Sequence, residues 1–159
     1  MAQVKAFGWY QQNMPVAIPG MKADSTIDVI DSFCAEKAIN PGDAVIRGTG
    51  EQQVKPVSAA GDIANVIGIA VHTHKDYSGE GAYYEEDYCL PVMTFGDVYV
   101  EVAGTVTAGG AVAMGVTDGS AGFYAHGATV GSGTATDVTG MTYLASGVKG
   151  DIVPVRIRK

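Results

Sequence analysis

The chain has 159 residues, which is enough for one domain or for two very small ones that share a core. Its hydrophobic content of 47% and mean hydropathy of +0.13 exclude a disordered chain. The net charge of −7 repels phosphate groups, so direct binding to nucleic acid or to anionic membranes is disfavoured.

Glycine accounts for 22 residues, and much of the remainder is Val, Ala, Thr and Ile with 8 Tyr. Short runs of β-branched and aromatic residues separated by glycine are typical of strands joined by tight turns. Long runs of Leu, Glu, Lys and Ala, which a helical bundle needs, are absent. The composition therefore predicts an all-β fold, either a small β-barrel or a β-sandwich.

Residues 1–26 differ from the rest, because residues 7–24 are aromatic, apolar and interrupted by Pro15, Pro19 and Gly20. No helical or strand period is sustained there, so we expect an extended N-terminal arm, followed by a single all-β domain over residues 27–159. An apolar arm needs a surface to lie on, which is its own domain, a neighbouring subunit or a partner. No signal peptide or membrane span is expected, which predicts synthesis in the cytoplasm.

Four strands are predicted before residue 75. Residues 26–37 alternate in part, residues 44–47 follow a turn at Pro41-Gly42, and residues 54–57 form a short edge strand limited by Pro56. Residues 65–73 are the best candidate for a central strand.

The later part continues this pattern. Residues 75–88 are polar and acidic and predict a surface loop, and residues 89–95 and 97–102 predict a hairpin joined at Gly96-Asp97. Residues 122–124 and 141–145 read as further strands, and the glycine-rich residues 126–140 predict a mobile loop. Residues 152–157 form the last predicted strand.

An internal repeat links the two parts of the chain. Residues 39–45 and residues 106–112 each contain an apolar residue, a glycine turn and then Ala-Val entering a strand. Each copy is followed by a polar stretch and two more strands. We therefore expect two related β-turn-β halves that close a pseudo-symmetric barrel or sandwich.

One motif suggests a metal. His72 and His74 lie two residues apart, so on a strand they share a face, and Asp76 follows. A catalytic zinc needs three protein ligands with supporting groups, and His126 is the one other histidine in the sequence. We expect polar histidines at a strand end, and a zinc hydrolase stays as an alternative.

Other chemistry is not indicated. The acidic residues Glu80, Glu85, Glu86 and Asp87 lack the ordered donors of a calcium loop, and no nucleophile elbow or phosphate-binding loop is present. Cys34 and Cys89 are expected to be reduced and buried. The sequence predicts no catalytic residue, no metal, no cofactor and no enzymatic activity. A second alternative is a carbohydrate-binding β-module that stacks sugars on Tyr77, Tyr83 and Tyr84.

Several segments in order resemble the structural cement, or capsid decoration, proteins of tailed bacteriophages. They are YQQ at 10–12, PVAIPGMKADS at 15–25, AINPGDAVIRGT at 38–49, QVK at 53–55, IGIAV at 67–71, DVYVEV at 97–102, VTAGG at 106–110 and the C-terminal strand. Residues 114–140 are longer and richer in glycine than the family pattern, which leaves room for an extra surface feature.

The resemblance implies a small all-β virion protein that is made in the host bacterial cytoplasm and binds the capsid exterior. It would bind the major capsid protein as a homo-oligomer, either dimer or trimer, and cement neighbouring subunits so that the head is stabilised. For the arm we expect a capsid-binding role, carried by Trp9, Tyr10, Met14, Pro15, Ile18, Pro19 and Met21.

Overall fold

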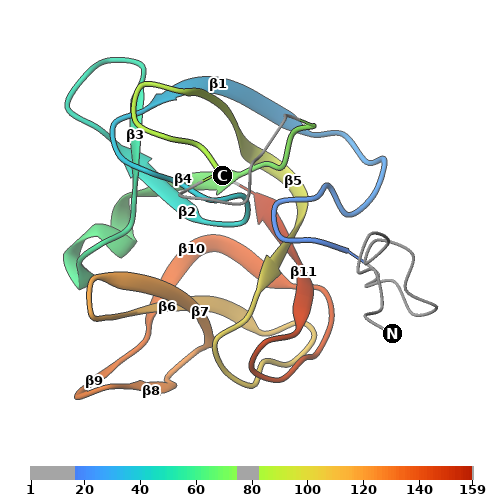
Figure 1. Ribbon diagram of the computed structural model, residues 1–159. Helices are drawn as coiled ribbons and strands as arrows, with labels where there is room; N and C mark the ends of the chain where they lie inside the picture. Colours follow the sequence, from blue (N-terminus) through green and yellow to red (C-terminus); the bar gives the residue numbers. More distant parts are fainter. Residues whose placement is uncertain (1–16, 75–82, 159) are drawn as a thin grey trace, which may run out of the picture.

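The computed structural model describes residues 17–74 and 83–158, and nearly all of its regular structure is β-strand (Figure 1). The first half contains β1 (Val29–Ala35), β2 (Ala44–Arg47), β3 (Gln53–Pro56), β4 (Val66–Ala70) and the long β5 (Cys89–Glu101). The second half contains β6 (Ala111–Thr117), β7 (Ser120–Ala125), β10 (Thr136–Tyr143) and β11 (Ile152–Arg158), with a two-stranded hairpin of β8 (Thr129–Val130) and β9 (Gly133–Thr134). A 3-10 helix, Ala60–Asn65, precedes β4. The described residues contain no helix long and apolar enough to cross a membrane.

The first half is a closed, mixed five-stranded barrel. Its strands pair in the order β1-β3-β2-β4-β5, and β5 pairs back with β1 to complete the ring. The pairing of β1 with β3 is parallel and the other four pairings are antiparallel. Closure removes most of the open strand edges that an isolated sheet would expose.

The second half repeats this plan and uses β5 again. Here the order is β5-β11-β10-β6-β7, and a parallel bridge between Val102 and Phe123 brings the end of β5 back to β7. The strand β5 is thus the last strand of the first ring and the first strand of the second. Figure 1 shows it in yellow, running from the upper group of strands to the lower group.

The backbone hydrogen bonds of the two halves match in detail. Gly42 donates to Ala70 (2.8 Å) and Ala70 donates to Asp43 (2.9 Å), just as Gly109 donates to Tyr143 (2.8 Å) and Tyr143 donates to Gly110 (3.0 Å). Val71 donates to Pro91 and Leu144 donates to Pro154, both at 2.9 Å. The predicted repeat at residues 39–45 and 106–112 is confirmed, and it extends over both rings.

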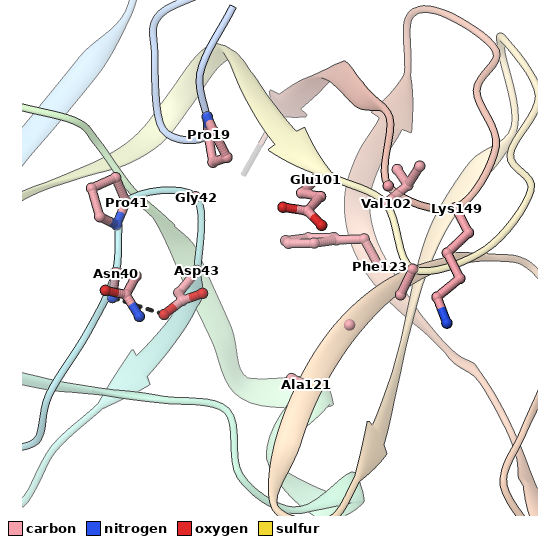
Figure 2. Close-up of a pocket in the computed structure, with 13 residues that line it drawn as sticks. Pro19, Asn40, Pro41, Gly42, Asp43, Glu101, Val102, Ala121, Phe123 and Lys149 are labelled. Atoms are coloured by element: carbon pink, nitrogen blue, oxygen red, sulfur yellow. Dashed lines mark hydrogen bonds between the residues drawn. The ribbon is translucent and has the colours of Figure 1, made fainter. Parts of the chain in front are cut away.

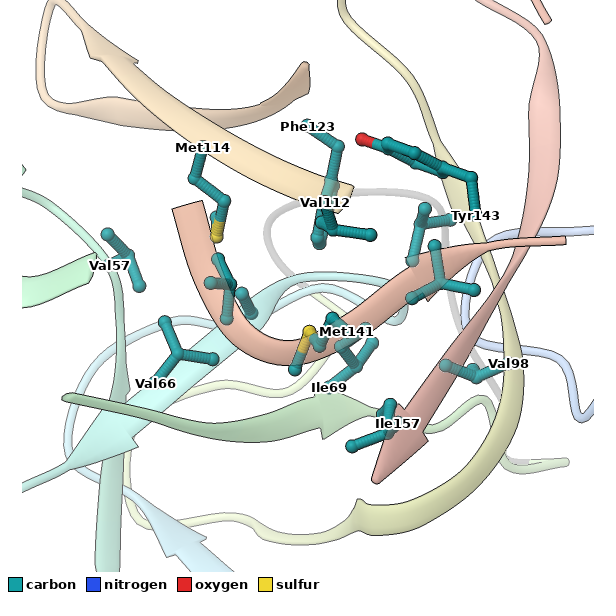
Figure 3. Close-up of a cluster of buried hydrophobic side chains, with 14 of the residues drawn as sticks. Val57, Val66, Ile69, Val98, Val112, Met114, Phe123, Met141, Tyr143 and Ile157 are labelled. Carbon is teal, nitrogen blue, oxygen red and sulfur yellow. The ribbon is translucent and has the colours of Figure 1, made fainter. Parts of the chain in front are cut away.

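Two large clusters of buried side chains fill the body, and a small third cluster consists of Ala113, Val130 and Ala135. The smaller of the two large clusters lies within the first ring and includes Phe33, Val45, Val54, Tyr84 and Val92. The larger one joins the two halves and includes Ile69, Met93, Met114, Met141 and Ile157 (Figure 3).

The strands that separate these clusters bury both faces. On β2, β4 and β5, neighbouring residues point to opposite clusters, as in Val45 and Ile46, Ala70 and Ile69, and Val92 and Met93. This explains why residues 65–73 read as a continuous apolar run rather than an alternating one.

The predicted hairpin at Gly96-Asp97 is wrong, because β5 continues through these residues. Gly96 has φ of +135°, and a Cβ there would lie 2.8 Å from the Asp28 Cβ and 2.9 Å from the Met93 Sδ. Glycine at this position lets the strand bend from one ring into the other instead of turning back.

Three further expectations differ from the structure. Residues 126–140 are not simply a loop, because they form β8, β9 and the start of β10, and Val130 packs where a Cβ on Gly115 would lie. Tyr83 and Tyr84, placed in a surface loop, are buried. Cys34 and Cys89 are free thiols, but Cys34 is only partly buried and Cys89 is exposed.

Candidate capsid-binding surface

The root of the predicted arm lies on the body. Of the seven residues assigned to capsid binding, Ile18, Pro19 and Met21 fall within the described residues, whereas Trp9, Tyr10, Met14 and Pro15 lie outside them. The side chains of Ile18 and Met21 are exposed, at 39% and 41%. Ala17, directly before them, is buried.

Two glycine turns hold this root in place. In the first turn the Met21 N–H donates to the Ile18 carbonyl (3.1 Å), and in the second the Asp43 N–H donates to the Asn40 carbonyl (3.1 Å). A Cβ on Gly20 would lie 2.7 Å from the Pro41 Cβ, and a Cβ on Gly42 would lie 2.7 Å from the Pro19 Cβ. The turns therefore pack glycine against proline, at a distance that a larger residue would not allow.

Residues 20–23 also extend the sheet. Gly20 donates to the Tyr99 carbonyl (2.7 Å), Tyr99 donates to the Met21 carbonyl (2.8 Å), and Ala23 donates to the Asp97 carbonyl (2.8 Å). On the other side, His72 donates to the Gly20 carbonyl (2.8 Å). This antiparallel bridge, with Lys22 opposite Val98, holds residues 20–23 against β5.

Two hollows adjoin the arm root. One, of about 340 Å³, is bounded by Ile18, Pro19, Asn40, Pro41, His72 and Tyr83. The other, of about 470 Å³, lies between the turn at Asn40–Asp43 and the second half, where Glu101, Phe123 and Lys149 face it (Figure 2).

The larger hollow holds charged groups but no catalytic set. The Asn40 N–H donates to Asp43 Oδ2 (2.8 Å), and burial raises the pKa of the Asp43 carboxyl although this hydrogen bond opposes the change. The described lining residues include neither a nucleophile with a neighbouring base nor a cluster of metal ligands. The described lining therefore forms a hollow without the groups of a catalytic site.

The histidine motif does not form a metal centre in the described residues. The rings of His72 and His74 have centroids 6.0 Å apart, and His72 also contacts the ring of Tyr83 at 5.0 Å. His126 pairs with a different residue, because its Nδ1 lies 2.8 Å from both carboxylate oxygens of Asp137. Asp76 and Glu80 lie outside the described residues. Among the described residues, no three His, Cys, Asp or Glu side chains are placed to hold a metal.

The sugar-stacking role is wrong for Tyr83 and Tyr84. Both side chains are buried, and the Tyr84 hydroxyl donates to the Val71 carbonyl (2.6 Å) while the Tyr83 hydroxyl donates to the Thr73 carbonyl. A ring that is covered in this way cannot stack on a sugar. Tyr77 lies outside the described residues.

Sequence reasoning missed other exposed apolar side chains. Ile27 is 83% exposed, and Val29 and Ile30 follow on β1 at 46% and 42%. Their apolar character is visible in the sequence, but the partial alternation of residues 26–37 predicts a strand without indicating which of its residues are exposed. A surface that combines the arm root with apolar residues on β1 can bind protein, and nothing in it indicates catalysis.

Comparisons with known proteins agree with this geometry. Residues 8–158 match the family described as structural cement protein (E217 gp24/Pam3 gp6). No curated protein matches. A chain of the capsid of Myoviridae phage XM1 superposes with a TM-score of 0.70 at 19% identity, over 100% of this chain and 99% of that one. The head fibre gp8.5 N base of bacteriophage phi29 gives a TM-score of 0.42 at 12% identity, over 83% and 95%.

The family match covers almost the whole chain, including residues 17–26 of the arm root and both rings. The likeness to the XM1 capsid chain shows the same fold over the full length. The protein therefore belongs to the phage structural cement family, a non-enzymatic component of the phage capsid.

Proposed function

We propose that the protein binds the outer surface of the assembled phage head and joins neighbouring major capsid subunits. The observation that carries this proposal is the family match over residues 8–158. The net charge of −7 suits the exterior of the particle, since no contact with the packaged DNA is needed there.

The arm, residues 1–26, is the proposed anchor, and residues 27–159 form the domain that carries it. Trp9, Tyr10 and Met14 supply large apolar surface, and Pro15 and Pro19 restrict the backbone before contact is made. Ile18 and Met21 support this role because they are exposed on a root that the body holds rigidly. The body would thus hold the base of the anchor in place before the anchor meets the capsid.

A homo-oligomer, either dimer or trimer, fits this mode of attachment. Several weak contacts made by linked copies add up to strong binding, because the second contact is made at a high effective concentration. A symmetric oligomer would also place its copies across the boundaries between capsid subunits.

Co-sedimentation with purified capsid shells tests the proposal. We expect the protein to pellet with matured, expanded shells and to raise the temperature at which those shells release DNA. Equal binding to unrelated particles of similar charge, or no binding to expanded shells, would contradict it.

The role of the arm has its own test. Replacing Trp9, Tyr10 and Met14 with serine should weaken binding to shells by about tenfold or more, because each loses buried apolar area. The unfolding temperature of the body should stay unchanged, since the substitutions leave every buried side chain among the described residues in place. Undiminished binding by the triple variant would remove the arm from the interface.

A further inference from the structure

One strand edge of the first ring has no partner among the described residues. Along β1, alternate residues direct their backbone groups to opposite sides. On the β5 side, the Ala35 N–H donates to the Tyr88 carbonyl (2.9 Å) and the Asp87 N–H donates to the Ala35 carbonyl (2.8 Å). On the other side, the Cys34 N–H donates to the Gln52 carbonyl (2.8 Å). The backbone N–H and C=O groups of Ile30 and Ser32 therefore face away from β5. On that side β3 pairs only with Cys34 and Ala35.

The equivalent edge in the second ring is covered. Val102 donates to Asp151 and accepts from Gly150, just as Ala35 donates to Tyr88 and accepts from Asp87. Val102 is therefore the equivalent of Ala35, and counting back along the two strands makes Tyr99 the equivalent of Ser32 and Asp97 the equivalent of Ile30. Tyr99 and Asp97 are the residues that pair with residues 20–23. The second ring therefore shows that this edge, next to the parallel strand, accommodates an added antiparallel strand.

The open edge is apolar and acidic. Ile27, Val29 and Ile30 are all exposed, and Asp28 and Asp31 lie among them. Asp28 is paired with Lys22 (2.5 Å), so Asp31 is the exposed acidic side chain that is left at this edge. Exposed edges usually carry charges that prevent uncontrolled pairing. The exposed Asp31 carboxylate disfavours another acidic strand at this edge and favours a segment that is neutral or positive.

We propose that the edge of β1 binds residues 3–7 of the N-terminal arm of a second copy as an added antiparallel strand. This segment, Gln-Val-Lys-Ala-Phe, contains neither proline nor glycine and ends at Gly8. Lys5 is the one charged side chain in residues 1–16, so the segment complements the acidic edge. Main-chain hydrogen bonds to Ile30 and Ser32 would supply the affinity.

The direction of the chain favours a second copy over the same one. Residues 20–23 run antiparallel to β5, with Lys22 opposite Val98. Towards the C-terminus the chain continues to β1, whereas towards the N-terminus it reaches Ala17, which lines one hollow together with Gly150 and Ile152. Ile152 pairs with Glu101, so Ala17, the first described residue, lies near the end of β5 opposite to the end that pairs with β1. Residues 8–16 can span up to about 30 Å, enough to reach an adjacent copy.

This contact joins copies of the cement protein, and its test needs no capsid, so it stands or falls separately from capsid binding. The test measures amide hydrogen exchange by NMR at Ile30 and Ser32. Val4→Pro removes a donor from the pairing segment, and Gln12→Pro makes the same change outside it. The Tyr99 amide, bonded to Met21 within each copy, reports that the fold is intact.

In concentrated wild type and in Gln12→Pro, exchange at Ile30 and Ser32 should be slower than in Val4→Pro by about tenfold or more, while Tyr99 stays slow in all three. Isotope-labelled Val4→Pro should regain slow exchange when unlabelled wild type is added, because the wild type supplies its arm. Adding unlabelled Val4→Pro should have no effect.

Three results would overturn the proposal. Slow exchange in wild type that persists at high dilution would place the arm on its own copy. Fast exchange in wild type at every concentration would mean that no arm binds there, even if capsid shells later protect the edge. Slow exchange in Val4→Pro equal to that in wild type would assign the edge to another segment.

Discussion

Asp97 is the single charged side chain that is buried among the described residues, with 1% of its surface exposed. Its carboxylate accepts two hydrogen bonds from Arg156, Nε at 2.9 Å and Nη2 at 2.7 Å, and Arg158 lies 3.9 Å away. These hydrogen bonds and the charge of Asp97 raise the pKa of Arg156. These two arginines thus hold β11 against β5 at the point where the two rings meet.

Replacing Asp97 with asparagine should lower the free energy of unfolding by ~2–3 kcal/mol, because two charge-assisted hydrogen bonds to a buried acceptor are weakened. Asp137→Asn is the matched control, since Asp137 pairs with the exposed His126 and should change stability by less than ~0.5 kcal/mol. Urea unfolding of both variants measures the difference. Equal effects would show that the buried pair contributes no more than a surface one.

Gly20 and Gly109 offer a second matched pair, because both have φ of +79°. A Cβ on Gly109 would meet nothing within 4 Å, whereas one on Gly20 would contact Pro41 and Ala70. Gly109→Ala should therefore cost ~1 kcal/mol of unfolding free energy from its backbone alone, and Gly20→Ala at least ~2 kcal/mol. If the two costs are equal in urea unfolding, the arm root is not held tightly against the turn at Pro41.

His72 should make stability depend on pH. Burial, and then the neighbouring His74, lower the pKa of His72 below its ordinary value of 6.5. The unfolded chain therefore takes up a proton more readily, so stability falls as the pH drops below about 6.5. His72→Gln should reduce the loss of stability between about pH 7.5 and 5.5, where carboxylates contribute little. An unchanged slope in urea unfolding would assign the pH dependence to other groups.

At the scale of elements, the unit that repeats is a five-stranded ring rather than a β-turn-β motif. The repeat at residues 39–45 and 106–112 was visible because each copy needs an apolar residue and a glycine at fixed places in its turn. Sharing β5 between the rings was not visible. It depends on Gly96 adopting φ of +135° within a strand, and glycine followed by aspartate is equally typical of a hairpin turn.

Cys34 and Cys89 lie directly opposite each other on β1 and β5. Cys34 directs its N–H away from β5, so the two face each other at a non-hydrogen-bonded position, where the Cα atoms of paired strands come within disulfide range. Oxidised glutathione should therefore form an intramolecular disulfide, with loss of two hydrogens in the intact mass and a higher unfolding temperature. Burial and the nearby Asp87 raise the pKa of Cys34, so the reaction should be faster at alkaline pH. Cys34→Ser is the control, and oxidation that yields only linked dimers would contradict this pairing.

At the scale of the whole molecule, composition and the ordered family segments were enough to predict an all-β body and a capsid role. What the sequence could not show is which apolar residues end up outside. Tyr83 and Tyr84 are candidates for sugar stacking from the sequence, but tertiary packing covers them. Ile27, Val29 and Ile30 are apolar in the sequence, and the structure leaves them exposed. Such outcomes depend on partners far away in sequence, which local patterns do not encode.

The described residues form a double ring that holds the arm root, residues 17–26, at the junction of the two rings. The arm root is held by hydrogen bonds to β5 and to His72, and by the contact of Gly20 and Gly42 with two prolines. Exposed apolar residues lie on that root and at β1, and Tyr88, Leu144 and Val148 are exposed elsewhere. In the proposed function both features would serve attachment to protein subunits, and neither requires a bound small molecule.

Cryo-electron microscopy of expanded shells mixed with the purified protein tests the central claim most directly. We predict added density on the outer surface that fits the double ring, with arm density from Trp9 to Met21 lying on more than one major capsid subunit. Shells that stay bare, or density confined to the inner surface, would contradict the account.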